Sequence, residues 1–159
     1  MEENQKFKGI LEKENVFIDL SANNWQQTLK MISNKLINNG IVKTSFKKAI
    51  INREEKFATG LQGTKFGVAI PHTDPEHVIK ESLSVAILKK PINFIHMGTQ
   101  DQKVSVQVIF TLALKTSDNQ LAMLQKLMEL IQNDIVLEEL TAATSKSTIV
   151  DIINHELNI

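Results

Sequence analysis

The sequence predicts an α/β fold in which a mixed β-sheet is flanked by helices in a layered sandwich. Two observations support this class: helix-like hydrophobic patterns occupy both ends of the chain, and runs rich in β-branched residues lie between them. Helices, then strands, then helices are typical of a layered α/β domain. With 159 residues and neither a low-complexity linker nor an internal repeat, we expect a single domain over residues 1–159.

A strand and a helix are expected first. The alternation of Val16, Ile18 and Leu20 predicts a short strand. The segment 21–40 predicts a helix, with Gly40 at its C-terminal cap. The apolar face of this helix is expected to hold Trp25, Leu29, Ile32 and Leu36.

A second helix is expected over residues 43–56. Its periodicity places Phe46, Ile50 and Phe57 toward the core. Arg53 then lies near the end of this helix, just before the chain turns toward the strands.

The middle of the chain predicts the sheet. Three glycines within residues 59–67 indicate an irregular connection, and strands are expected over residues 66–70, 82–90 and 104–115. The last strand alternates, so its second face, which is mixed, is expected to be covered by a helix or to lie beside a site. Its first face is expected to hold Val104, Val106, Val108, Phe110, Leu112 and Leu114.

Three further helices are expected to close the chain, near residues 119–132, 134–141 and 146–156. No run of apolar residues is long enough to span a bilayer. The N-terminus opens acidic and lacks the apolar core of a signal peptide. We therefore expect a cytoplasmic protein without membrane insertion.

Composition excludes several classes of function. Eighteen basic side chains balance eighteen acidic ones, so there is no basic excess of the kind that nucleic-acid-binding proteins carry. The chain has no cysteine, which excludes disulfides, thiolate metal sites and cysteine nucleophiles.

The candidate chemistry centres on His72, in the stretch GVAIPHTDPEH. Pro71 and Pro75 restrict the backbone around this histidine, so its imidazole is held at the end of a strand. Asp74 followed by Pro75 predicts the start of a short helix, whose free N–H groups would favour an anion.

The residues alone leave three interpretations of His72 open. It is a nucleophile that accepts a phosphoryl group, since a neutral imidazole is nucleophilic near pH 7. Alternatively, His72, Asp74 and His77 bind a metal ion, as in a hydrolase, although no fourth ligand is evident. In the third interpretation, His72 is a hydrogen-bonded structural histidine.

The stretch GVAIPHTDPEH, preceded by INREEKFATGL, resembles the active-site region of the IIA components of the bacterial sugar phosphotransferase system, fructose–mannitol class. The resemblance extends from about Leu11 to the C-terminus. It implies the mannitol/fructose-type IIA fold, with a helix that ends in an Arg–Glu pair and a strand that ends in Ala-Ile-Pro-His. A second histidine soon after this motif, here His77, is similar to the galactitol-type subset.

The resemblance also implies roles for individual residues. His72 matches the phosphorylated histidine, with Nε2 as the reacting atom, and Arg53 matches the arginine that pairs with phosphate oxygens. Gln120 stands where mannitol-type proteins have a second site histidine, and it supplies a hydrogen bond but no charge. Positive charge is then expected from Arg53 or His77.

By the same resemblance, phospho-HPr donates the phosphoryl group and a IIB component on a separate chain accepts it, for uptake of a galactitol-like polyol or sugar. No cofactor or metal is required. A regulatory role, in which phosphorylation alters binding to other proteins, is the alternative. We also expect apolar residues around His72 to meet the partners, with Phe57, Leu61, Phe66 and Val78 as candidates.

Overall fold

The computed structural model describes residues 6–159 and confirms the α/β class. Five strands form one mixed sheet in the order β1–β4–β5–β3–β2. The central pair, β4 and β5, is antiparallel; β1 runs parallel to β4, β3 runs parallel to β5, and β2 is antiparallel to β3. The strands are β1 (Val16–Leu20), β2 (Gly60–Gln62), β3 (Gly67–Ala69), β4 (Ser82–Ile95) and β5 (Lys103–Ala113).

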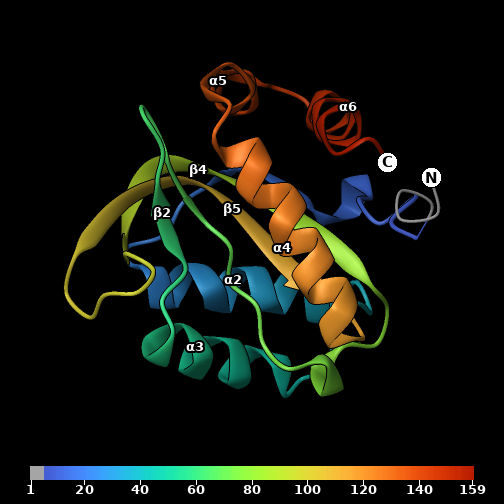
Figure 1. The fold of residues 1–159 in the computed structure, drawn as a ribbon. Coiled ribbons are helices and arrows are strands. Elements are labelled where there is room, and N and C mark those ends of the chain that lie inside the picture. Colours follow the sequence, from blue (N-terminus) through green and yellow to red (C-terminus); the bar gives the residue numbers. More distant parts are fainter. Residues whose placement is uncertain (1–5) are drawn as a thin grey trace.

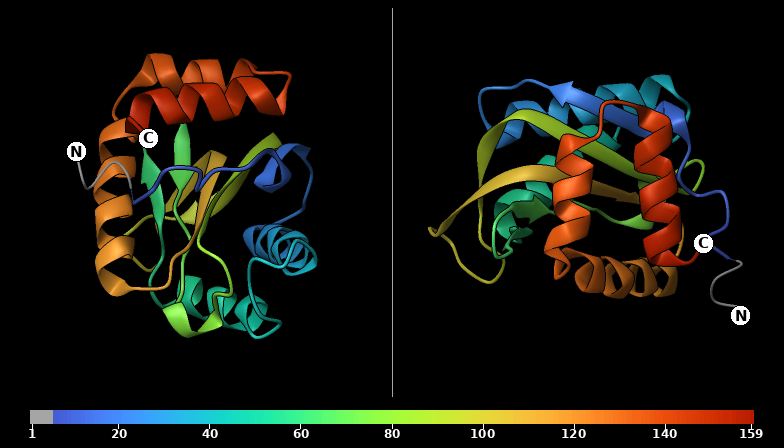
Figure 2. Two further views of the ribbon diagram at one scale, coloured as in Figure 1. Left: turned by 90° about the vertical axis from the view of Figure 1, so that its right-hand side faces the viewer. Right: turned by 90° about the horizontal axis from the view of Figure 1, so that it is seen from above.

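Helices cover both faces of this sheet (Figures 1 and 2). One face carries α2 (Trp25–Asn38) and α3 (Phe46–Lys56). The other carries α4 (Ser117–Ile131), α5 (Asp134–Ala142) and α6 (Lys146–Leu157). Two single-turn 3₁₀ helices, η1 (Lys13–Asn15) and η2 (Pro75–His77), complete the elements. Each α-helix expected from the sequence is present, although α3 begins later, at Phe46.

The core is divided by the sheet into two clusters of buried side chains. Ile109 of β5 packs on the side of α2 and α3, whereas Phe110 packs on the side of α4, α5 and α6. The mixed face expected for this strand is therefore covered by helices, and both faces of the sheet are buried.

A β-bulge changes which face the residues of β5 occupy. Gly67 pairs with Val106 but its neighbour Val68 pairs with Val108, so Gln107 is an extra residue. Val104 and Val106 consequently lie in the cluster under α2 and α3, while the residues from Val108 onward keep the predicted alternation. The prediction that all six apolar residues share one face is wrong, because it assumed an unbroken period of two.

Two other expectations about the strands need correction. The segment expected to be irregular contains the strand β2, and β4 continues well beyond residue 90. The chain accommodates Pro91 within β4 because the pairing register shifts between Ile87 and Ile92, so no ladder donor is needed at the proline.

Gly67 allows β3 to lie close against β5. A Cβ atom at this position would clash with the backbone carbonyl oxygen of Ser105. The strand that leads to His72 therefore needs a residue without a side chain at its first position.

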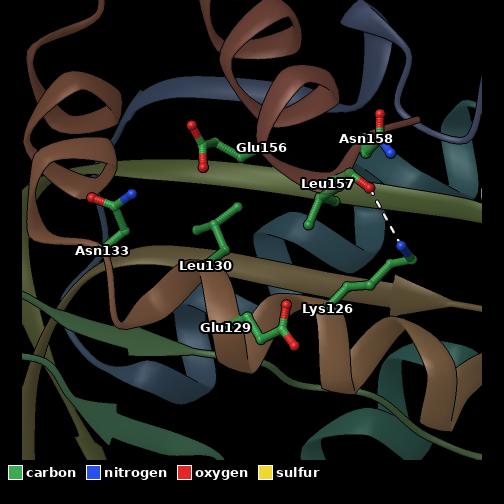
Figure 3. Close-up of a pocket in the computed structure, with 7 residues that line it drawn as sticks. All are labelled: Lys126, Glu129, Leu130, Asn133, Glu156, Leu157 and Asn158. Atoms are coloured by element: carbon green, nitrogen blue, oxygen red, sulfur yellow. Dashed lines mark hydrogen bonds between the residues drawn. The ribbon is translucent and has the colours of Figure 1, made fainter.

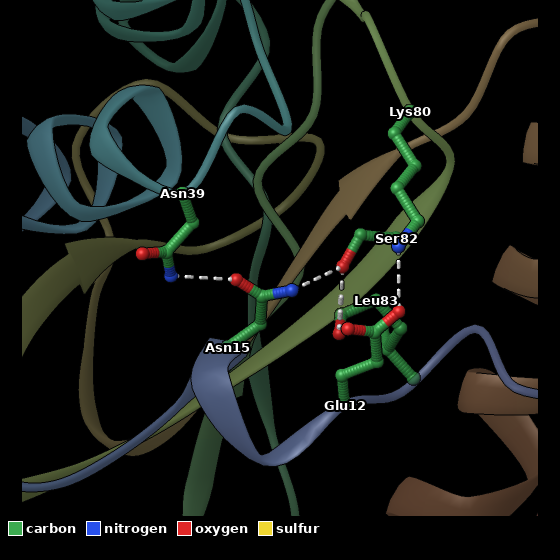
Figure 4. Close-up of polar contacts among 6 residues, drawn as sticks. All are labelled: Glu12, Asn15, Asn39, Lys80, Ser82 and Leu83. Atoms are coloured by element: carbon green, nitrogen blue, oxygen red, sulfur yellow. Dashed lines mark hydrogen bonds and ion pairs between the residues drawn. The ribbon is translucent and has the colours of Figure 1, made fainter.

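A set of polar contacts fixes the N-terminal segment against the rest of the fold (Figure 4). The buried Asn15 side chain donates to Ser82 Oγ on β4 at 3.1 Å and accepts from Asn39 Nδ2, after α2, at 3.1 Å. Lys80 and Glu12 form an ion pair at 2.7 Å nearby. These contacts hold the start of β1 against the start of β4.

Candidate functional site

His72 lies in the loop that follows β3, with its ring partly buried. Its Nδ1 lies 2.9 Å from the backbone carbonyl oxygen of Ile70. Because a carbonyl oxygen only accepts hydrogen bonds, this contact places the ring proton on Nδ1 and leaves the lone pair on Nε2.

The backbone on both sides of His72 is anchored by three separate parts of the chain. Ile70 N–H donates to the Thr59 hydroxyl at 3.2 Å. The Pro71 carbonyl accepts from Leu112 N–H of β5 at 3.2 Å. After the histidine, the Thr73 carbonyl accepts from the Gln120 side chain at 2.8 Å. The imidazole is therefore held in one orientation just after the end of β3, as expected from the sequence.

The His72 imidazole is held in its neutral form. Burial lowers the pKa of His72 below its ordinary value, and the positive charge of Arg53 lowers it further, while the hydrogen bond to Ile70 acts in the opposite direction. A neutral imidazole keeps the Nε2 lone pair, so the group is nucleophilic at pH 7.

Arg53 is in the last turn of α3 and is exposed. Its guanidinium carbon lies 4.4 Å from the centre of the Phe57 ring, in a cation–π contact. Phe57 itself is 59% exposed, so the prediction that it packs inward is wrong. The positive charge of Arg53 also acts on His72, because it lowers the pKa of that ring.

Gln120 lies in the first turn of α4, which begins after the N-cap Thr116. Its amide group donates to the Thr73 carbonyl, and this contact joins the start of α4 to the loop that carries His72. The donor expected to reach a phosphoryl oxygen is therefore engaged with the backbone.

His77, the second candidate histidine, ends η2 and contacts other residues than His72. Its Nδ1 lies 2.8 Å from Ser45 Oγ, and its Nε2 lies 3.5 Å from Glu76 Oε1. The Asp74 side chain, expected to cap this turn, makes no capping hydrogen bond. Within residues 6–159, no three His, Cys, Asp or Glu side chains are grouped so as to hold a metal ion.

Sequence reasoning missed Glu54, a buried carboxyl group that is linked through Thr59 to the residue holding His72. This side chain is 4% exposed and accepts hydrogen bonds from the Thr59 backbone N–H and hydroxyl, both at 2.9 Å. Burial raises the pKa of Glu54 from 4.5 to about 7, against the lowering effect of these bonds. The available signal was spacing, because Phe46, Ile50 and Glu54 fall on one buried helix face.

The apolar surface beside His72 also differs from the expected one. Val78 is buried in the core, and Leu61 and Phe66 pack against the cluster under α4 to α6, so of the four candidates only Phe57 is exposed. A groove of about 500 Å³ lies instead along α4 and reaches Ile70, two residues before His72. Its apolar lining is Ile70, Met97, Leu121, Leu124 and Met128.

A second hollow, between α4 and the end of α6, has a polar lining (Figure 3). It has a volume of about 270 Å³ and includes Lys126, whose Nζ donates to the Leu157 carbonyl at 3.4 Å, together with Glu129 and Glu156. None of the site residues expected from the sequence lines it. None of the helices in residues 6–159 has both the length and the apolar character needed to span a bilayer.

A family model described as "Phosphoenolpyruvate-dependent sugar phosphotransferase system, EIIA 2" matches residues 9–156. Among characterised relatives, the multiphosphoryl transfer protein 1 of Escherichia coli K12 is 30% identical over 152 residues, which are 93% of this chain. The chain spans only 17% of the length of that relative. The galactitol-specific EIIA component of Escherichia coli K12 is 29% identical over 126 residues, covering 78% of this chain and 79% of that protein.

Solved structures have the same fold. A Streptococcus mutans protein described as a PTS IIA superimposes with a TM-score of 0.76 and 25% identity, over 97% of this chain and 94% of that one. The mannitol IIA of Escherichia coli, in its complex with phosphorylated mannitol IIB, superimposes with a TM-score of 0.73 and 18% identity, over 93% and 98% of the two chains.

Proposed function

Because this chain belongs to the EIIA 2 family of the phosphoenolpyruvate-dependent sugar phosphotransferase system, we propose that it is a phosphocarrier whose acceptor is Nε2 of His72. The observation that supports this most directly is the 2.9 Å contact between His72 Nδ1 and the Ile70 carbonyl, which leaves Nε2 as the nucleophile. The lowered pKa of His72 acts in the same direction, because it keeps the ring unprotonated.

The transfer needs an in-line approach and little other chemistry from the protein. The Nε2 lone pair forms a bond to phosphorus, the bond between phosphorus and the donor atom breaks, and the donor keeps that electron pair. The Nδ1 proton stays on His72, where the Ile70 carbonyl stabilises the positive charge that the ring acquires. Handing the group on reverses these steps at a new acceptor.

Arg53 is the cation for the transferred group. Its exposed guanidinium has planar donors suited to phosphoryl oxygens, and it lies near enough to His72 to lower the pKa of that ring. Gln120 acts through the backbone, since its side chain holds the Thr73 carbonyl. His77 has a structural role at the start of α3, through Ser45.

The donor is phospho-HPr and the acceptor is a IIB component on another chain, and both dock beside His72. The solved complex of mannitol IIA with phosphorylated mannitol IIB supports this pairing. Docking uses the groove along α4, where Leu121 is 57% exposed and Met128 is 39% exposed. The transported compound is a galactitol-like polyol or sugar, which the likeness to the galactitol-specific EIIA component supports.

The experiment is intact-mass analysis after incubation with phosphoenolpyruvate, enzyme I and HPr. The wild type is expected to gain one acid-labile phosphoryl group, and His72→Ala is expected to gain none while remaining folded. His155→Ala, at an exposed position on α6, is the control and should be phosphorylated as the wild type is.

A phosphorylated His72→Ala protein would show that another residue is the acceptor. A transport role is then tested by mixing the phosphorylated wild type with a galactitol-type IIB component. Transfer of the phosphoryl group to IIB supports transport. A phosphoprotein that keeps its phosphoryl group, and that binds IIB no more tightly than the unphosphorylated protein does, would favour the regulatory alternative.

A further inference from the structure

A continuous chain of hydrogen bonds leads from α3 to the ring of His72. The Glu54 carboxyl group lies 2.9 Å from the Thr59 hydroxyl through each of its oxygens. The same hydroxyl accepts the N–H of Ile70 at 3.2 Å. The carbonyl of Ile70 then lies 2.9 Å from Nδ1 of His72.

The geometry assigns a direction to this chain. The Thr59 hydroxyl donates its one proton to the Glu54 carboxyl group, and one of its lone pairs accepts the N–H of Ile70. Ile70 follows the last residue of β3, and its N–H is satisfied by the Thr59 side chain. Thr59 is therefore the part of the chain that fixes the residue whose carbonyl holds His72.

The chain is also almost completely shielded from water. Ile70 has no exposed surface, Thr59 is 3% exposed and Glu54 is 4% exposed. Burying a carboxyl group is unfavourable unless it is hydrogen-bonded, and the other inward positions of α3, Phe46 and Ile50, are apolar. Glu54, the third inward residue of α3, therefore needs a hydrogen-bond partner, and Thr59 is that partner.

We propose that Thr59 and Glu54 are positioning residues that select the Nδ1–H tautomer of His72. They fix Ile70, so its carbonyl stays where it accepts the Nδ1 proton and Nε2 keeps its lone pair. Without them Ile70 loses the anchor of its N–H, its carbonyl is held less firmly, and the ring also adopts the tautomer with its proton on Nε2, which cannot attack. This proposal rests on His72 being the phosphoryl acceptor.

The first test compares Thr59→Val with Thr59→Ser. Valine keeps the shape of threonine but lacks the hydroxyl, whereas serine keeps the hydroxyl. Thr111→Val is the matched control, because among residues 6–159 Thr111 is a buried threonine whose hydroxyl has no hydrogen-bond partner. Two readouts are used: the ¹⁵N chemical shifts of the His72 ring in the unphosphorylated protein, and the rate of phosphoryl transfer from phospho-HPr.

Thr59→Val is expected to show a mixture of His72 tautomers and a transfer rate about tenfold lower than wild type. Thr59→Ser and Thr111→Val are expected to keep a single Nδ1–H tautomer and a rate near that of wild type. A Thr59→Val protein with the wild-type tautomer and rate would overturn the proposal.

If Thr59→Val does not fold, Glu54→Gln and Glu54→Met are compared by the same readouts. Glutamine retains an oxygen that accepts from Thr59, so it is expected to keep the Nδ1–H tautomer, whereas methionine is expected to give a mixture. Equal tautomer populations in the two variants would overturn the proposal. The chemical shifts need no donor, so they report on Thr59 and Glu54 even if the mass experiment shows that His72 is not the acceptor.

Discussion

The segment that carries His72 and the side chain of Arg53 are held in opposite ways. Ile70, Pro71 and Thr73 each have a backbone group anchored by a different part of the fold. Arg53 is exposed on the last turn of α3, and its guanidinium contacts the ring of Phe57, which is itself 59% exposed. The proposed nucleophile is fixed, whereas the proposed cation lies on the surface.

This difference fits a group that must be received from one protein and given to another. A nucleophile gains from a fixed direction of attack, because even a small displacement of the attacking atom lowers the reaction rate. A cation that neutralises charge must meet the phosphoryl oxygens in two different complexes, so a movable guanidinium is suited to this task. We therefore expect substitutions at Arg53 to affect transfer alone, and substitutions around His72 to affect transfer and structure together.

Arg53→Ala is expected to have the largest effect on transfer. Loss of charge-assisted hydrogen bonds to the phosphoryl group should lower the transfer rate about 100-fold, with His72 still phosphorylated in the end. The measurement is rapid-quench kinetics with phospho-HPr. The same change should raise the pKa of His72, since a like charge is removed, and an NMR titration of the ring checks this.

Lys56→Ala is the matched control, because it removes a positive charge from the same last turn of α3. It should transfer at the wild-type rate. If Lys56→Ala and Arg53→Ala slow transfer equally, the effect comes from the general positive potential of the helix end, and the specific role of Arg53 is wrong.

The second prediction concerns how the free energy of unfolding depends on pH, through the ionisation of Glu54 and His72. The pKa of Glu54 is raised from 4.5 to about 7 in the folded protein, so its contribution to stability is intact below pH 4.5 and is lost as pH rises through about 7. His72 has a lowered pKa and acts oppositely: its contribution is present above its ordinary pKa of 6.5 and is lost as pH falls below that value.

Urea unfolding at about pH 5 and about pH 8 should separate the two groups. Between these conditions the wild type is expected to lose on the order of 2 kcal/mol of unfolding free energy relative to Glu54→Gln, which has no carboxyl group to ionise. Parallel pH profiles for the wild type and Glu54→Gln would mean that the pKa of Glu54 does not differ between the folded and unfolded protein, which would contradict the raised pKa.

Gln120→Ala is expected to have the smallest effect of the three. It removes one hydrogen bond to the Thr73 carbonyl and leaves the anchors before His72 in place, so transfer should slow by about fivefold. Gln120→Glu removes the donor but keeps the length of the side chain, and it should behave like alanine or worse because it also brings a negative charge to the site. A wild-type rate in both variants would show that the anchor after His72 is dispensable.

Much of the fold could be predicted because its signals are local. The apolar faces of α2 and α4 to α6 and the β-branched runs of β4 and β5 follow from periods that the sequence displays directly. The bulge at Gln107 was missed, since it depends on how β5 pairs with β3. The strand β2 was missed because its three residues form a strand only by pairing with β3.

The residues of the candidate site also include some that the sequence predicts and others that depend on contacts between distant segments. His72 stands out because two prolines fix the backbone around it, and Arg53 was assigned through the family motif. Glu54 and Thr59 were missed because their importance depends on contacts between α3, the loop after it and the end of β3. The spacing of Phe57 predicts an inward side chain because it continues an apolar face, but the helix ends at Lys56 and the chain turns away.

The edges of the sheet bear on how this chain behaves in a crowded solution. The strand β2 at one edge has only three residues, and β1 at the other has five, with a register shift and a left-handed backbone at Asp19 (φ 57°). The two long strands, β4 and β5, lie inside the sheet. Short or distorted edges offer few free backbone groups for another chain to add a strand. The protein therefore exposes an apolar groove along α4 while offering little template for aggregation through its sheet.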